Sequence, residues 1–294
     1  MAIGEPASVV AVGALLGEGP VWNPRESALW FVDIKGYRIH RFDPAAGALD
    51  SWDAPAQPGW VLPAEDGGFV VGLQGGIHRF DPATGAFTAI APVEADRPGN
   101  RLNDACTDGQ GRIWLGSMDD AEEADTGRIY RFENGRLVDP GLPPVCITNG
   151  PAISPDGRTL YHVDTLGRRV WACALAQDGR LGAPRLFAEI GDREGYPDGP
   201  TVDSEGHVWI GLFAGWAARR YAPDGALVET VHFPVANVTK LAFGGDDLKT
   251  VYATTAAKGL SADERERQPL AGNLFSFRVD VPGVPVTPAR TEAA

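Results

Sequence analysis

Short apolar runs recur along the chain, and a turn rich in Gly, Asp or Ser introduces each of them. Six such runs are RESALWFVDI, DGGFVVGL, GQGRIWLGSM, PDGRTLYHVD, SEGHVWIGLF and DDLKTVYATT. Runs of this length, bounded by turn residues, are typical of β-strands. Their starts are separated by roughly 40–50 residues, which is the period expected of propeller blades.

A second apolar run and another turn follow each of these strands, as in GYRIHRFDPAAGAL, GGIHRFDPATGAF and GRIYRFENGRL. The DP-x-x-G and x-D-G turns favour hairpins, since Gly adopts a positive φ without steric cost. Each repeat therefore predicts a few antiparallel strands that are apolar on both faces and cannot bury both faces alone. Stacking the repeats radially around a channel buries these faces and shortens the exposed sheet edges.

We therefore expect an all-β fold, a six-bladed β-propeller, with residues 1–294 forming a single domain. The strand expected at residues 8–12 would pair with the last repeat near residues 273–279, so that both ends of the chain close the ring. Two packed sandwiches are the alternative, but they do not explain why the same turn pattern recurs six times. No long helix is predicted. The charged segments DDAEEADTG (residues 119–127) and ADERERQ are expected to be inserted loops, the first either solvated or a rim element over the channel mouth.

Composition narrows the location and the partners. The 37 glycines and 24 prolines among 294 residues fit short strands joined by tight turns. A net charge of −13 would repel nucleic acid and anionic membranes, so neither is an expected partner. No apolar stretch reaches the roughly 20 residues that span a bilayer, and the apolar run near the N-terminus lacks the basic flank of a signal peptide. Three cysteines without C-x-x-C spacing suit a reducing compartment, so a cytoplasmic location is expected.

Familiar catalytic motifs are missing from the sequence. It contains no G-x-S-x-G, no G-x-x-x-x-G-K, no G-x-G-x-x-G and no H-E-x-x-H. The histidines are scattered without the spacing of metal ligands, and a structural or surface role is expected for each: His40, His78, His162, His207 and His232. Nothing in the sequence therefore indicates a serine nucleophile or a histidine-based metal site.

A set of polar residues instead occurs near the expected axis, next to Gly or Pro and apolar strands. These are Glu18 in LGEGP, Arg101, Asn103 and Asp104 in NRLNDA, Asn149 in ITNGPA, Asp164 in YHVDT and Asp198 in YPDGP. Turn formation explains any one of them, but equivalent positions of a radial repeat all point towards one channel. Glu18, Asn149 and Asp198 together would supply oxygen ligands of net charge −2. Such a set suits a hard or borderline divalent cation with open positions for water and substrate.

Five segments of the chain resemble, in order and spacing, the successive signatures of the SMP-30/gluconolactonase/LRE family. They are LGEGPVW, RLNDACTDGQGRIWLGSM, ITNGPAISPDGRTLYHVDT, YPDGPTVDSEGHVWIG and LAFGGDDLKTVYATTA, and they span about residues 13–259. The resemblance implies a six-bladed propeller that holds one divalent metal cation in its channel and hydrolyses a sugar lactone. It implies metal binding by Glu18, Asn149 and Asp198, and substrate binding by Arg101 and Asn103. Lys240 and the acidic loop lie outside the shared pattern.

The implied reaction is the attack of water on the carbonyl carbon of a cyclic ester, with the metal polarising the carbonyl oxygen. Asp198 is the candidate catalytic base as well as a metal ligand. Asp164 either orients a water or has a structural role. Ca²⁺, Zn²⁺, Mn²⁺, Mg²⁺ and Fe²⁺ all accept such a ligand set. Two alternatives stay open: a metal-binding propeller scaffold without turnover, and a metal-dependent esterase or organophosphate hydrolase.

Overall fold

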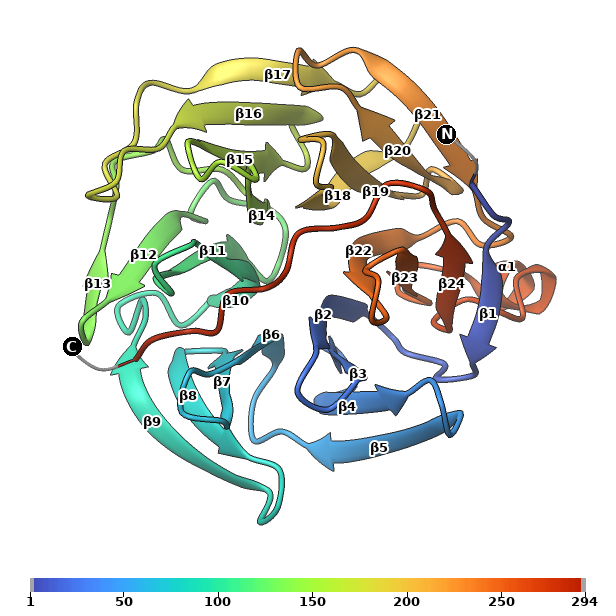
Figure 1. Ribbon diagram of the computed structural model, residues 1–294, viewed down its shortest axis with the longest axis horizontal. Helices are drawn as coiled ribbons and strands as arrows, with labels where there is room; N and C mark the ends of the chain where they lie inside the picture. Colours follow the sequence, from blue (N-terminus) through green and yellow to red (C-terminus); the bar gives the residue numbers. More distant parts are fainter. Residues whose placement is uncertain (1–2, 292–294) are drawn as a thin grey trace.

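The computed structural model describes residues 3–291, which form β-sheets arranged around a central axis, as in a β-propeller (Figure 1). Four of the sheets contain four antiparallel strands each. The first is β2 (Gly17–Asn23), β3 (Ala28–Asp33), β4 (Arg38–Asp43) and β5 (Ala48–Asp53); the second is β6 (Pro58–Pro63), β7 (Phe69–Leu73), β8 (Gly76–Asp81) and β9 (Ala86–Pro92); the third is β10 (Asn100–Thr107), β11 (Ile113–Asp119), β12 (Ile129–Glu133) and β13 (Arg136–Val138); the fourth is β14 (Thr148–Ile153), β15 (Thr159–Asp164), β16 (Arg169–Ala174) and β17 (Arg185–Glu189).

The fifth sheet has eight strands in the order β1-β24-β23-β22-β18-β19-β20-β21. Its members are β1 (Ala7–Val10), β18 (Tyr196–Val202), β19 (Val208–Phe213), β20 (Ala217–Tyr221), β21 (Leu227–His232), β22 (Val238–Gly244), β23 (Thr250–Thr255) and β24 (Leu274–Arg278). Two antiparallel four-stranded runs meet here through one parallel pair, Gly199 and Lys240. The sequence predicts six separate sheets, whereas hydrogen bonding joins two of them, because β18 and β22 approach closely beside the axis.

The first and last strands of the chain lie side by side. Strand β1 pairs with β24 in antiparallel fashion, with Ser8 opposite Phe275 and Val10 opposite Leu274. Figure 1 shows the N-terminal strand in blue against the last strand in red. A segment from each end of the sequence therefore contributes to the same sheet.

Every strand that lines the axis contains a β-bulge. In β2, three positions separate Glu18 from Val21, while only two separate their partners on β3, Val32 and Trp30. The pairing of the other five inner strands shifts in the same way, between Pro58 and Trp60, Leu102 and Ala105, Asn149 and Ala152, Pro197 and Pro200, and Val238 and Leu241. Bulges of this kind bend a strand and redirect its side chains, and they are common beside active sites.

Glycines at these bulges permit the inner strands to approach one another. A Cβ atom on Gly59 would lie 2.5 Å from the backbone oxygen of Leu102, and one on Gly19 would lie 3.2 Å from the Cα of Trp60. Gly19 also has a φ of +55°, which side chains rarely adopt. Gly59 and Gly19 therefore lie at close contacts between neighbouring inner strands.

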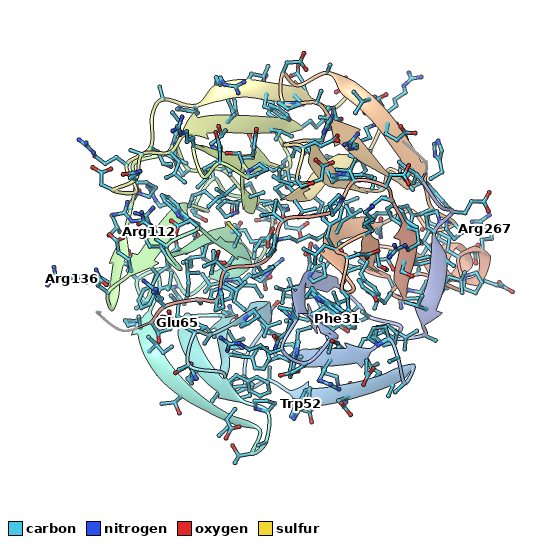
Figure 2. All side chains as sticks on the ribbon, in the orientation of Figure 1. Phe31, Trp52, Glu65, Arg112, Arg136 and Arg267 are labelled. Carbon is cyan, nitrogen blue, oxygen red and sulfur yellow. The ribbon has the colours of Figure 1, made fainter. Side chains whose placement is uncertain are left out.

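Between the sheets lies a continuous apolar filling with tryptophans at its centre. Trp30, Trp60, Trp114 and Trp209 are all fully buried. Figure 2 shows Phe31 inside the ring, whereas Arg136 and Arg267 extend from its outer edge. Burial of this apolar surface is the main stabilising contribution to the fold.

Two of these tryptophans hydrogen-bond to a buried aspartate that also binds an arginine. Asp203 accepts hydrogen bonds from Trp209 Nε1 at 3.0 Å and from Arg220 Nε at 2.8 Å. Asp108 accepts from Trp114 Nε1 at 3.0 Å and from Arg112 Nε at 2.6 Å. The same arrangement in two sheets ties the turn before the second strand to the core.

The segment after β24, residues 279–291, crosses one face of the ring and covers one end of the central channel (Figure 1, red). Ala289 exchanges backbone hydrogen bonds with residues of the second sheet, donating to Pro63 at 2.8 Å and accepting from Glu65 at 3.0 Å. Thr107 donates a hydrogen bond to the backbone oxygen of Thr287. A cavity of about 270 Å³ lies beneath this segment, between it and the ends of the inner strands.

The ADERERQ segment corrects one expectation, because it forms a short helix, α1 (Ala262–Arg267), rather than a loop. Ser261 accepts a hydrogen bond from the backbone of Glu264, and the Glu264 carboxylate accepts one from the backbone of Ser261 in return. This capping box satisfies donors that the first turn leaves free. Within residues 3–291, no helix has both the length and the apolar character needed to cross a membrane.

We predict that Asp203→Ala lowers the free energy of unfolding by about 3–5 kcal/mol, because it removes the buried partner of the Arg220 charge and leaves only the exposed Glu205 beside it. Urea unfolding monitored by tryptophan fluorescence measures the change. Asp192→Ala is the matched control, since the Asp192 side chain is fully exposed, and it should change stability by less than about 0.5 kcal/mol. Equal effects of the two substitutions would contradict a stabilising role for the buried network.

Candidate active site

A cavity of about 250 Å³ opens at the end of the channel where the inner strands begin. Its polar lining comes from four of these strands and comprises Glu18, Arg101, Asn103, Asn149 and Asp198. Thr165, Glu122 and Lys258 add polar groups, and the apolar wall comprises Leu16, Met118, Ile147, Leu166, Tyr196 and Phe213. All five residues that the sequence analysis assigned to metal or substrate therefore face one cavity.

Glu18 is held rigidly at the start of β2. The segment before it is fixed by Asp33, which accepts hydrogen bonds from the backbone nitrogens of Leu15 and Leu16, both at 2.9 Å. The Glu18 side chain accepts one from the Gly19 nitrogen at 2.8 Å. Its exposed fraction is only 2%. Gly19, next to this carboxylate, permits the close approach of β6, since a Cβ atom on Gly19 would lie 3.2 Å from the Cα of Trp60.

Glu18 and Asp198 form a pair of buried carboxylates. Burial, and next the negative charge of Asp104, raises the pKa of Glu18 to about 7. Burial and the charge of Glu18 raise the pKa of Asp198 well above its usual range. Two carboxylates that share an enclosed site repel each other when both are ionised. A cation between them would offset this repulsion.

Asn149 completes the candidate ligand set from β14. Its Nδ2 donates to the hydroxyl of Thr165 at 2.9 Å, and its Oδ1 accepts from Asn103 Nδ2 at 3.0 Å. These two contacts assign the orientation of the Asn149 amide, with its oxygen on the side of Asn103. An amide oxygen has a second lone pair, so this oxygen can accept one further contact.

Asn103 links the candidate ligand Asn149 to Arg101. Its Nδ2 also donates to the backbone oxygen of Thr148 at 2.7 Å, and its Oδ1 accepts from Arg101 Nη1 at 2.6 Å. The amide of Asn103 is thus occupied by protein partners on both sides. Its role includes holding two other site residues in place, which the sequence alone did not reveal.

Arg101 is buried and fixed by an acidic residue of the rim. Its Nε donates to Asp120 Oδ1 at 2.8 Å, and its Nη1 donates to the backbone oxygen of Leu102 at 3.1 Å as well as to Asn103. Among the residues that the structure describes, its Nη2 makes no hydrogen bond. A planar guanidinium held in this way presents donors to oxygen atoms at a fixed angle.

The acidic loop forms part of the rim. Asp120 accepts hydrogen bonds from Lys35 at 2.6 Å and from Gln57 at 2.9 Å. Although burial acts to raise the pKa of Asp120, these two bonds and the charge of Arg101 lower it to about 2. Glu122 pairs with Lys258 across the opening. The sequence left two roles open for this loop, and its contacts agree with the rim element.

Asp164 and His162 do not line this cavity. The carboxylate of Asp164 accepts a hydrogen bond from the Gly167 nitrogen at 2.9 Å and so stabilises the turn after β15. His162 is buried, and burial lowers its pKa to about 4. The structural alternative for Asp164 therefore has direct support. The sequence did not indicate Lys258, which lines the cavity, or Lys35, which donates a hydrogen bond to Asp120 at the rim.

The donor set fits a hard divalent cation. Glu18 and Asp198 supply carboxylate oxygens and Asn149 an amide oxygen, which are ligands that Ca²⁺, Mg²⁺ and Mn²⁺ accept. In the described part of the chain, no group of three or more His, Cys, Asp and Glu side chains is placed to hold a metal ion. A cation at this site would therefore depend on the amide and on water or substrate oxygens in addition to the two carboxylates.

Comparison with known proteins agrees with this arrangement. The chain is 34% identical to the 6-deoxy-6-sulfogluconolactonase of Pseudomonas putida over 276 residues, which cover 94% of this chain and 95% of that protein. It is 35% identical to the L-arabinolactonase of Azospirillum brasilense, over 88% of this chain and 87% of that one. The crystal structure of a calcium-binding protein, regucalcin, from Agrobacterium tumefaciens superposes with a TM-score of 0.94 at 29% identity, covering 98% of both chains. Residues 16–257 match the model of the SMP-30/gluconolactonase/LRE-like region, and the chain belongs to that family.

Proposed function

We propose that this protein is a metal-dependent lactonase that hydrolyses a sugar lactone to the sugar acid. The observation that carries the proposal is the convergence of Glu18, Asn149, Asp198 and Arg101 on one small cavity. Relatives that cover most of the chain are named for lactones of different sugars, which supports the reaction class more than any single sugar. Of the relatives named above, two are named as lactonases and one as a calcium-binding protein, and none is named for an organophosphate or another ester.

Glu18, Asn149 and Asp198 are the proposed ligands of one divalent cation. When bound, such a cation acts as a Lewis acid that polarises a carbonyl oxygen and stabilises negative charge on it. Their burial keeps competing water away, and the hydrogen bonds to Gly19, Thr165 and Asn103 hold the donor atoms in place. The identity of the cation follows from the assay below.

Arg101 and Asn103 are the proposed substrate-binding residues. Hydrogen bonds to Asp120 and Asn103 fix the Arg101 guanidinium through Nε and Nη1. Its Nη2, which bonds to no other described residue, can therefore bind a hydroxyl or carbonyl oxygen of the substrate at a defined position. Asn103 contributes mainly by holding the side chains of Arg101 and Asn149 in fixed positions. Together they would orient a lactone ring against the wall of Tyr196 and Phe213.

Asp198 is also the proposed catalytic base. It would accept the proton of the attacking water and return it to the ring oxygen as that oxygen leaves. Among the described residues, no histidine lines the cavity. Its carboxylate, which is ionised when it holds a cation, lies in the same cavity as the other proposed ligands.

We further propose that residues 1–294 form one domain, a β-propeller of six blades. Six inner strands carry the same one-residue bulge, and the eight-stranded sheet consists of two four-stranded runs joined by a single parallel pair. Pairing of β1 with β24 supports closure by both ends of the chain. Three free cysteines support the cytoplasmic location.

Removal of divalent cations should abolish hydrolysis of lactones but leave the fold intact, because the sheets are held by apolar contacts away from the ligands. Acid release from a panel of aldonolactones, with far-ultraviolet circular dichroism of the stripped protein, measures both properties. Each of Ca²⁺, Zn²⁺, Mn²⁺, Mg²⁺ and Fe²⁺ is then added in turn to find the one that restores turnover. Full activity of the stripped protein would remove the metal from the proposal.

Arg101→Ala should reduce kcat/KM by about 10–100-fold, the value of a lost hydrogen bond to a charged donor. Metal stoichiometry, measured by elemental analysis, should stay near that of the parent, because Arg101 is not a proposed ligand. Arg97→Ala is the matched control, since Arg97 pairs with Glu94 outside the cavity. Loss of the metal from Arg101→Ala would show that its role has been assigned wrongly.

Asp198→Asn should reduce turnover at saturating metal and lactone by about 10²–10⁴-fold, since an amide cannot accept a proton at neutral pH. The substitution keeps an oxygen donor, so excess cation should restore metal occupancy. Asp164→Asn serves as the control and should remain within a few-fold of the parent. A fully occupied Asp198→Asn protein with a near-parental rate would leave Asp198 as a ligand only.

A further inference from the structure

A buried ion pair lies in the channel between the two cavities. Asp104 belongs to the bulge of β10 and Lys240 to that of β22, and the Lys240 ammonium donates a hydrogen bond to Asp104 Oδ1. The Asp104 side chain has no exposed surface, and that of Lys240 is 8% exposed. The pair thus sits below the candidate ligands and above the cavity that the C-terminal segment covers, which Lys240 lines.

Asp104 connects this ion pair to β14, the strand that carries the candidate ligand Asn149. Its Oδ2 accepts a hydrogen bond from the backbone nitrogen of Gly150 at 2.9 Å, and its Oδ1 accepts another from Ala105 at 2.7 Å. Gly150 directly follows the candidate ligand Asn149 in the bulge of β14. Any movement of the Asp104 carboxylate would therefore be transmitted to the backbone that positions Asn149.

The charges around the channel balance only when Lys240 is counted. Glu18, Asp198 and Asp104 are three buried carboxylates beside one channel, and they contribute three negative charges when all of them are ionised. Arg101 acts on Glu18 and Lys258 acts on Asp198, but each of these cations is already paired with another carboxylate, Arg101 with Asp120 at 2.8 Å and Lys258 with Glu122. One divalent cation and the Lys240 ammonium together cancel the three carboxylates.

Other groups beside Lys240 do not supply this charge. The thiol of Cys106 lines the same covered cavity, and burial raises its pKa far above the neutral range, so it stays uncharged. The hydroxyls of Thr239 and Thr254 bond to each other at 2.8 Å, and Thr254 also donates to the backbone oxygen of Lys240 at 3.2 Å. Without Lys240, the Asp104 carboxylate would be an unpaired buried charge, which another cation or a proton would have to neutralise.

We propose that Lys240 is a positioning residue whose ammonium acts as a built-in cation for Asp104, so that the channel takes one divalent cation rather than two. The inference rests on the proposed metal site at Glu18, Asn149 and Asp198. It assigns a role to a lysine that touches neither the proposed substrate pocket nor the ligands. Its effect passes through Asp104 and Gly150 to Asn149.

The test compares Lys240→Met with the double variant Lys240→Met/Asp104→Asn, which removes both charges. In metal-free protein, the single substitution should lower the melting temperature by roughly 10 °C, because it leaves a buried carboxylate unpaired. The double variant should recover most of this loss. Arg278→Met is the matched control, since it breaks an exposed ion pair with Asp247, and it should leave the melting temperature nearly unchanged.

Cation stoichiometry provides the second measurement. Equilibrium dialysis with Ca²⁺ or Mn²⁺, followed by elemental analysis, should find one cation per chain in the parent, two in Lys240→Met and one in the double variant. A stoichiometry of one in Lys240→Met, or of two in the parent, would overturn the inference while leaving the lactonase proposal standing. A parent that binds no cation would instead refute the metal site, and the inference with it. If Lys240→Met does not fold without metal, a folded double variant with one cation supports the inference, and an unfolded one contradicts it.

Discussion

The β-bulge in each inner strand, which adds one residue to it, determines which side chains point into the channel. In a regular strand, neighbouring side chains point to opposite faces, so Asn103 and Asp104 would diverge. The bulge in β10 allows both to reach the channel: Asn103 bonds to Thr148 and Asn149 of the neighbouring β14, and Asp104 bonds to Gly150 of β14 and to Lys240 of β22. A polar site thus forms inside sheets whose other inner positions pack as apolar core.

The bulges also explain why glycine and proline accompany the functional residues. Proline has no backbone N–H to donate to a ladder, so a bulge is one of the few places within a sheet that admits it. Pro20 and Pro151 occupy such unpaired positions, next to Gly19 and Gly150, both of which have positive φ. The GEGP and NGP motifs are therefore backbone requirements of the bulge as much as signatures of the chemistry beside it.

The sequence was informative where a property depends on residues that are close together along the chain. Short apolar runs bounded by Gly-containing turns predicted the strands and hairpins, and the order of the motifs predicted the family, which the comparison confirmed. The bulges escaped prediction because an unpaired residue is defined only by the register of another strand. Lys35 and Lys258 escaped for a similar reason: charged residues outside the strands are usually solvated, and only the closed ring brings these two to the acidic loop at the rim. The capping box at Ser261 was a local signal for α1 that the charged composition of the segment concealed.

The pairing of β1 with β24 has a consequence for how the chain folds during synthesis. Ser8 and Phe275 are neighbours in the sheet but are separated by almost the whole sequence. Bringing together segments so distant costs closure entropy, and proteins dominated by such contacts fold slowly. Strand β1 must remain without this partner until β24 has been translated. The ring therefore closes only after β24 has left the ribosome, and until β1 pairs with it the open edge of β24 is available to other chains as a site for aggregation.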